Sequence, residues 1–177
     1  MRQRRTFITL TLILGALVLS IAYAAITGQT LNVVGNILTE TSDANFSIAF
    51  SGSPVINKPT LADGSEMTDV IVDASYIGKN AILNVSGLNA KGQTVTAIYT
   101  VKNSSADIEA ILSDVDVQYD NTAWFDVDAV LSSQLLSAKG GTATLTITIT
   151  LKDTPATDAE VAAATDDFTV SFTADAK

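Results

Sequence analysis

The strongest constraint on the fold is a segment in which threonine and apolar residues alternate without exception. Residues 142–151 read TATLTITITL, so every second side chain is apolar. Successive side chains of a β-strand point to opposite faces of its sheet, and this two-residue period predicts a strand with one buried face. Residues 93–102 and 168–174 show nearly the same alternation. The chain is therefore expected to fold around sheets.

Further β-type segments occur along the chain, separated by turn-forming residues. They comprise residues 30–38, 45–50, 69–76, 81–88, 108–119 and 124–131. Gly, Asn, Asp and Pro cluster between these segments, as they do between the strands of all-β proteins. Eight or nine short strands of this kind predict an all-β fold, an antiparallel β-sandwich of the jelly-roll or Greek-key type.

Three places in this pattern carry more specific expectations. Gly52-Ser53-Pro54 is expected to end the strand that begins near residue 45, because glycine and proline interrupt strands. The apolar positions change phase within residues 108–119, which predicts a bulge or bend near Ser113 and Asp114. Residues 129–136 fit either a short helix or a strand edge.

The first 25 residues differ in character from the rest. Arg2, Arg4 and Arg5 form a cationic start, and an uncharged apolar stretch follows over residues 7–25. With the A-x-A sequence at Ala22 and Ala24, this layout predicts a hydrophobic signal helix over residues 1–24, removed by a signal peptidase after Ala24. The alternative is a retained membrane anchor, because the apolar stretch approaches the roughly 20 residues that span a bilayer.

Either segment is expected to export the remainder of the chain. Residues 25–177 are long and apolar enough for a single β-sandwich domain, which would contact the membrane only through the signal segment. They carry 7 Lys and 19 acidic residues, a net charge of −12. Such an acidic surface repels a phosphate backbone, and nucleic-acid binding is not expected.

The residue inventory removes several classes of chemistry. The chain has no Cys and no His. These absences exclude disulfides, thiolate and imidazole metal sites, and catalytic triads based on histidine. We therefore expect a secreted or cell-surface protein that is not an enzyme and needs no cofactor.

Five aspartates within fifteen residues are the one pattern that suggests a metal. They are Asp114, Asp116, Asp120, Asp126 and Asp128. Hard oxygen ligands of this kind could hold Ca²⁺, but their spacing does not match an EF-hand loop. A solvated acidic face that keeps sheet edges apart is the favoured interpretation. A glycosidase acid-base pair would also need sugar-stacking aromatic residues, of which the chain has few.

Three stretches carry a resemblance to a known family. Residues 21–25 followed by 31–35, residues 92–105 with their Lys102-Asn103-Ser104 ending, and residues 143–155 with 168–174 resemble the exported TasA/camelysin-like proteins of Gram-positive bacteria. The resemblance implies a jelly-roll subunit of extracellular biofilm-matrix fibres, exported through the Sec route. The metallopeptidase role attached to camelysin is not carried over, because the chain lacks histidine and thiolate ligands.

The resemblance also implies a mode of assembly. In such fibres the N-terminal segment of one subunit adds as a strand to the sheet of the next, which gives a head-to-tail homopolymer. Here residues 25–38 are the candidate donor strand. Its candidate residues are Ile26, Gly28, Leu31, Val33, Gly35 and Ile37. Two alternatives remain: this segment is the first strand of its own domain, or the protein is a membrane-tethered monomeric module for surface adhesion or binding.

Overall fold

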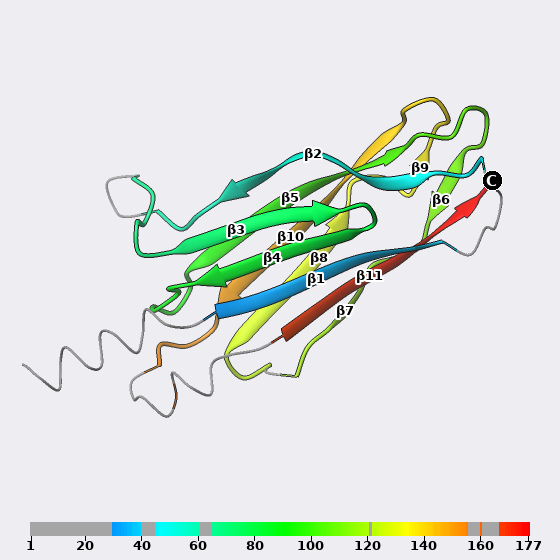
Figure 1. Cartoon of the computed structure of the whole chain (residues 1–177). Coiled ribbons are helices and arrows are strands. Elements are labelled where there is room, and N and C mark those ends of the chain that lie inside the picture. The colour runs from blue at the N-terminus through cyan, green and yellow to red at the C-terminus, as the bar shows by residue number, and fades with distance from the viewer. Residues whose placement is uncertain (1–29, 40–44, 61–64, 121, 156–159, 161–166) are drawn as a thin grey trace, which may run out of the picture.

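The computed structural model describes residues 30–39, 45–60, 65–120, 122–155, 160 and 167–177. In these residues the chain forms eleven β-strands (Figure 1). They are β1 (Thr30–Thr39), β2 (Ile48–Asn57), β3 (Ile71–Ile77), β4 (Asn80–Ser86), β5 (Thr94–Asn103), β6 (Ala110–Leu112), β7 (Asp116–Gln118), β8 (Phe125–Leu131), β9 (Leu135–Leu136), β10 (Thr142–Leu151) and β11 (Asp167–Ala176). The prediction of an all-β fold is confirmed.

The strands form two sheets. A seven-stranded sheet has the order β3-β4-β1-β11-β6-β9, with β7 also paired to β11, and a four-stranded sheet has the order β2-β5-β10-β8. Buried apolar side chains from both sheets belong to one core cluster. Two sheets that enclose one apolar core are the arrangement of a β-sandwich.

The alternation in β5 and β10 decides which side chains enter this core. Every second residue is buried, from Val95 to Val101 on β5 and from Ala143 to Leu151 on β10. Burying one large aliphatic side chain stabilises the fold by about 1.5–3 kcal/mol. The threonines in between form the outer face, where the hydroxyls of Thr94 and Thr150 are 3.1 Å apart across the two strands.

β1 departs from the predicted antiparallel arrangement. It pairs antiparallel with β4 but parallel with β11, so that the first and last strands lie side by side and run in the same direction (Figure 1). The remaining ladders of the seven-stranded sheet are antiparallel, so this sheet is mixed. Alternation of side chains reports which face of a strand is buried and says nothing about its direction.

β2 continues past its predicted end. The strand runs to Asn57, and its register against β5 shifts between Ser51 and Val55. Gly52 has a φ of 69°, and the Gly52-Ser53-Pro54 run is accommodated as a bulge. The predicted stop was wrong because β2 is an edge strand, where a proline removes no ladder hydrogen bond.

The predicted bulge near Ser113 is confirmed. Ala174 lies opposite Leu112 and Ser171 lies opposite Asp116, so three residues between β6 and β7 face two residues of β11. The Thr173 N–H donates to the Ser113 hydroxyl at 2.9 Å, which supplies a partner inside the bulge. Residues 129–136 contain the end of β8 and the short strand β9, so the strand-edge interpretation was correct.

The signal segment, residues 1–24, lies outside the described residues. Within the described part of the chain, no helix is long and apolar enough to cross a membrane.

Candidate strand-exchange site

The candidate site is the position of β1 between β4 and β11, which we call the β1 slot. Residues 32–39 lie opposite residues of β11, and residues 30–36 lie opposite residues of β4. β1 therefore has a paired neighbour along each of its edges over most of its length. Its place in the sheet depends on backbone hydrogen bonds to two strands.

Three of the predicted donor residues come together on the inner face of β1. Val33 and Ile37 are 1% and 3% exposed, and Gly35 between them is also buried. Their alternation places all three toward the core. Val33, Gly35 and Ile37 therefore lie on the buried face of β1, and their role in a donated strand stays a prediction.

The other predicted donor residues are placed less completely. The backbone of Leu31 lies opposite Val85 of β4, but its side chain is outside the described residues. Ile26 and Gly28 also lie outside the described residues.

Large apolar residues flank the inner face of β1 on both neighbouring strands. Val33 lies opposite Leu83 of β4 and Phe168 of β11. Ile37 lies opposite Phe172 of β11. The three flanking side chains are at most 2% exposed, so the slot forms part of the main core.

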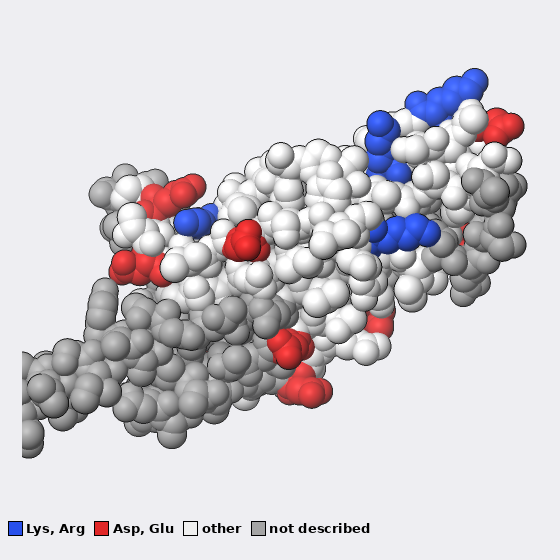
Figure 2. Space-filling view, viewed as in Figure 1, with Lys and Arg blue, Asp and Glu red and all other residues white. Residues whose placement is uncertain are grey.

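The outer face of β1 is accessible. Val34 and Leu38 point away from the core and are 42% and 54% exposed. Val34 lies opposite the half-buried Ile82 of β4. On the face of the molecule shown in Figure 2, charged side chains are scattered among mostly uncharged residues.

Tyr99 of β5 connects β4, one of the strands that border the slot, to the opposite sheet. Its side chain is 1% exposed, and its hydroxyl donates to the carbonyl oxygen of Ile82 at 2.7 Å. Burial, and to a smaller extent the negative charge of Asp73, raises the pKa of Tyr99 well above its ordinary value. The hydroxyl therefore stays protonated and keeps its hydrogen bond between β5 and β4.

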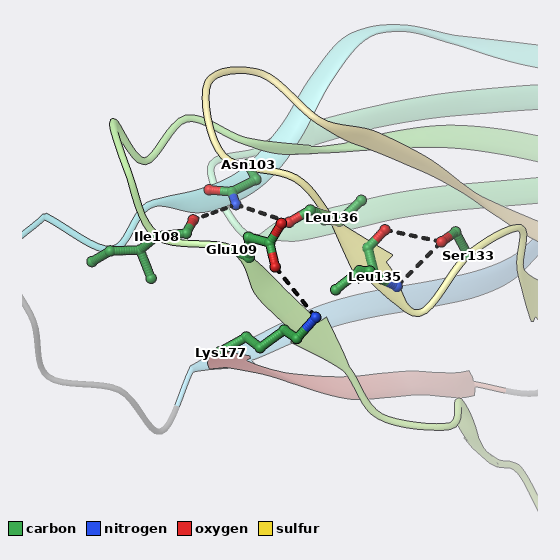
Figure 3. Close-up of polar contacts among 7 residues, drawn as sticks. All are labelled: Asn103, Ile108, Glu109, Ser133, Leu135, Leu136 and Lys177. Atoms are coloured by element: carbon green, nitrogen blue, oxygen red, sulfur yellow. Dashed lines mark hydrogen bonds and ion pairs between the residues drawn. The ribbon is translucent and has the colours of Figure 1, made fainter.

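A buried amide organises one end of the sandwich (Figure 3). The Asn103 Nδ2 donates to the carbonyl oxygens of Ile108 at 2.9 Å and Leu136 at 3.3 Å, and its Oδ1 accepts from the Ser105 N–H at 3.0 Å. The Ser105 hydroxyl in turn accepts from the Ser47 N–H at 2.9 Å. These bonds join β5, the segment before β6, β9 and the segment before β2.

The Lys102-Asn103-Ser104 sequence is therefore a structural element at this end. In the sequence these residues contribute only to the family resemblance, and the pattern did not predict their structural role. A lone asparagine at the end of an alternating strand is the only signal that could have suggested a buried, hydrogen-bonded amide. The nearby ion pair between Lys177 and Glu109, at 3.3 Å, is half exposed and adds little stability.

The five aspartates occupy separate places along two strands and their loops. Asp114 lies in the bulge, Asp116 on β7, Asp120 after β7, and Asp126 and Asp128 on β8. Among the described residues, no group of three or more acidic side chains could hold a metal ion. Asp126 and Asp128 are exposed on an edge strand, as the interpretation of a solvated acidic face requires.

A cavity of about 310 Å³ lies beside the bulge. Ser113, Asp114, Val130 and Gln134 are among the residues that line it. The Gln134 amide donates to the Asp114 carboxylate at 2.6 Å. Glycoside hydrolysis uses two carboxyl groups on either side of the bond, whereas the lining of this cavity supplies one.

The fold and the slot together define a two-sheet β-domain whose first strand is held at the centre of the larger sheet. Comparison with models of known protein families and with curated proteins gave no match to this chain.

Proposed function

We propose that the protein is a structural subunit of an extracellular, biofilm-matrix type of filament, in which β1 of one subunit occupies the β1 slot of the next. The observation that carries this proposal is the position of β1. A strand at the N-terminal end of the domain fills a gap between β4 and β11, and the two flanking strands come from later parts of the chain.

The energetics of the slot favour its occupation by a β1 strand, either the subunit's own or that of another subunit. Without β1, the backbone groups of β4 and β11 that pair with it would face water, and so would the side chains of Leu83, Phe168 and Phe172. An inserted strand would bury these side chains again, at about 1.5–3 kcal/mol for each large apolar side chain, and would replace hydrogen bonds to water by backbone hydrogen bonds worth about 0.5–1.5 kcal/mol net each. An empty slot therefore binds an extended strand strongly, and a second copy of this chain supplies a strand that makes every native contact.

The connection after β1 allows the donor to come from a neighbour. Eight residues, 40–47, link Thr39 to Ile48, and an extended chain of this length reaches up to about 28 Å at roughly 3.5 Å per residue. Donation from each subunit to the next is a heterologous contact that does not close on itself. The product is an open, head-to-tail homopolymer.

The proposal includes export and a jelly-roll connectivity. Residues 1–24 act as a signal helix that a signal peptidase removes, which leaves residue 25 at the start of the donor segment. The chain passes repeatedly from one sheet to the other, as from β1 to β2 to β3 and from β7 through β8 and β9 to β10. This alternation between layers favours a jelly-roll or Greek-key path.

Engineered disulfides test the exchange, because the natural chain contains no cysteine. Val34 and Ile82 are partners on the outer face of β1 and β4. We expect Val34→Cys and Ile82→Cys chains, mixed and polymerised, to form disulfides between subunits. The double variant, oxidised as a monomer, has β1 locked in its own slot and should enter filaments only after reduction.

Electron microscopy of secreted residues 25–177 gives the companion measurement, with a chain lacking residues 25–38 as the assembly-deficient control. If the mixed single-cysteine chains form filaments but no disulfides between subunits, β1 is not the exchanged strand.

A second candidate function is a membrane-tethered monomer for surface adhesion or binding. The observation that favours it is that β1 already fills its own slot and buries Val33 and Ile37 there. Mass spectrometry of the native N-terminus separates the candidates. A start at residue 25 removes the tether, whereas an intact Met1 or Arg2 contradicts the filament proposal.

A further inference from the structure

We propose that the β1 slot is a sequence-selective peptide-binding site, with Gly35 and Ala81 as the pair that sets its register. The ligand class is an extended strand with a glycine at its centre and large apolar residues two positions away on each side. For a β1 strand donated by a neighbouring subunit, this inference rests on the proposed strand exchange. For the chain's own β1, the inference is independent of strand exchange.

The spacing between β1 and β4 at Gly35 is the first observation. Gly35 lies opposite Ala81 on β4 and Val170 on β11. A Cβ at Gly35 would lie 3.2 Å from the Cβ of Ala81. Cβ atoms directly opposite each other in antiparallel strands are ordinarily about 4.5–5.5 Å apart. The two strands therefore approach closely on the inner face, at the point where β1 has no side chain.

The backbone of Gly35 shows that space, and not conformation, requires the glycine. Five other described glycines have positive φ values, and Gly35 does not belong to that group. An alanine at this position could adopt the local backbone without strain. Its methyl group would instead meet Ala81, which is itself 1% exposed and held in the core.

This pair disfavours other registers of the inserted strand. A shift by two residues would bring Val33 or Ile37 opposite Ala81, where even one additional carbon is crowded. A shift by one residue would turn Val33 and Ile37 to solvent, because side chains alternate between the faces. The native register is the one that fills the core and leaves the position opposite Ala81 empty.

The same pair discriminates among strands of this protein. The central positions of β10 and β11 carry Ile147 and Val170, each flanked by large apolar residues. Either strand would bring a branched side chain against Ala81. β1 combines Val33 and Ile37 with a central glycine, so a β1 segment, from the same chain or from a second copy, fits the slot.

Reciprocal substitution tests the inference in residues 25–177. We expect Gly35→Ala to lower the midpoint of thermal unfolding and to reduce disulfide formation between mixed Val34→Cys and Ile82→Cys chains. Adding Ala81→Gly to the same chain should restore both, because it removes the methyl group that the new one meets. Ala97→Gly on β5 is the matched control and should rescue neither measurement.

Peptide competition measures the selectivity directly. A peptide of residues 26–39 should inhibit filament growth on the natural chain, and its Gly35→Ala form should inhibit it less. With Ala81→Gly subunits both peptides should inhibit equally.

The outcomes distinguish the two proposals. If the natural chain stays monomeric even when it folds in concentrated solution, strand exchange fails, and the unfolding midpoints of the four combinations at Gly35 and Ala81 still test the register pair. If Gly35→Ala has no effect on stability, or if Ala81→Gly rescues it no better than Ala97→Gly does, the register pair is refuted whatever the filaments do.

Discussion

Replacing the buried Asn103 by leucine is expected to destabilise the domain by about 3 kcal/mol. The substitution keeps the side-chain size and removes three hydrogen bonds, to Ile108, Leu136 and Ser105. Each such bond contributes about 1 kcal/mol net, and groups left without a partner raise the cost further. Because 1 kcal/mol shifts the unfolding midpoint of a domain of this size by roughly 2–4 °C, the midpoint should fall by about 6–12 °C.

The single tryptophan provides the assay. Trp124 packs partly buried against the core, so its fluorescence should report global unfolding in urea. The transition of Asn103→Leu should move to lower urea with an unchanged slope, because the surface exposed on unfolding stays the same. Ser104→Ala, at the exposed neighbouring position, is the matched control. A loss below about 1 kcal/mol would refute the assignment of Asn103 as the residue that joins these segments.

Three further outcomes follow from other parts of the structure. Stability should fall as the pH rises above about 10, the ordinary tyrosine pKa, because the unfolded chain then loses a proton that folded Tyr99 retains; in urea unfolding, Tyr99→Phe should flatten this decline. Gly87→Ala should lower the thermal midpoint far more than Gly78→Ala, because a Cβ at Gly87 would collide with the Asp69 carbonyl oxygen and one at Gly78 would meet open space. Calcium should leave the thermal midpoint unchanged, and a rise that a chelator reverses would support the metal interpretation of the aspartates.

The sequence predicts strands where the side-chain period is regular and fails where tertiary position decides. β10 and β5 follow their alternation closely, because each buries one complete face. At Pro54 the local rule predicted an end, but β2 lies at a sheet edge, where the missing N–H costs nothing. Whether a strand lies at the edge or at the centre depends on the assembled sheet, and a short stretch of sequence does not contain this information.

The candidate site shows the same division. The apolar positions Val33 and Ile37 follow from alternation, and the glycine between them permits a close approach of backbones. The partner in that approach is Ala81, which is 46 residues further along the chain and is fixed only by the register of β1 against β4. The parallel pairing with β11 likewise depends on bringing the two ends of the domain together.

Competition between a subunit's own β1 and that of its neighbour should make assembly depend on the history of the sample. An intramolecular strand on a short connection acts at an effective concentration of order millimolar, so closed monomers win when dilute chains refold. Once closed, β1 must break its pairing with both neighbours before it can be exchanged. We therefore expect residues 25–177, refolded from urea, to give monomers at micromolar concentration and filaments only when folding occurs in concentrated solution. Concentrating the closed monomers afterwards should give filaments far more slowly. Equal filament yields at all refolding concentrations would contradict exchange of β1, since no competition for the slot would then exist.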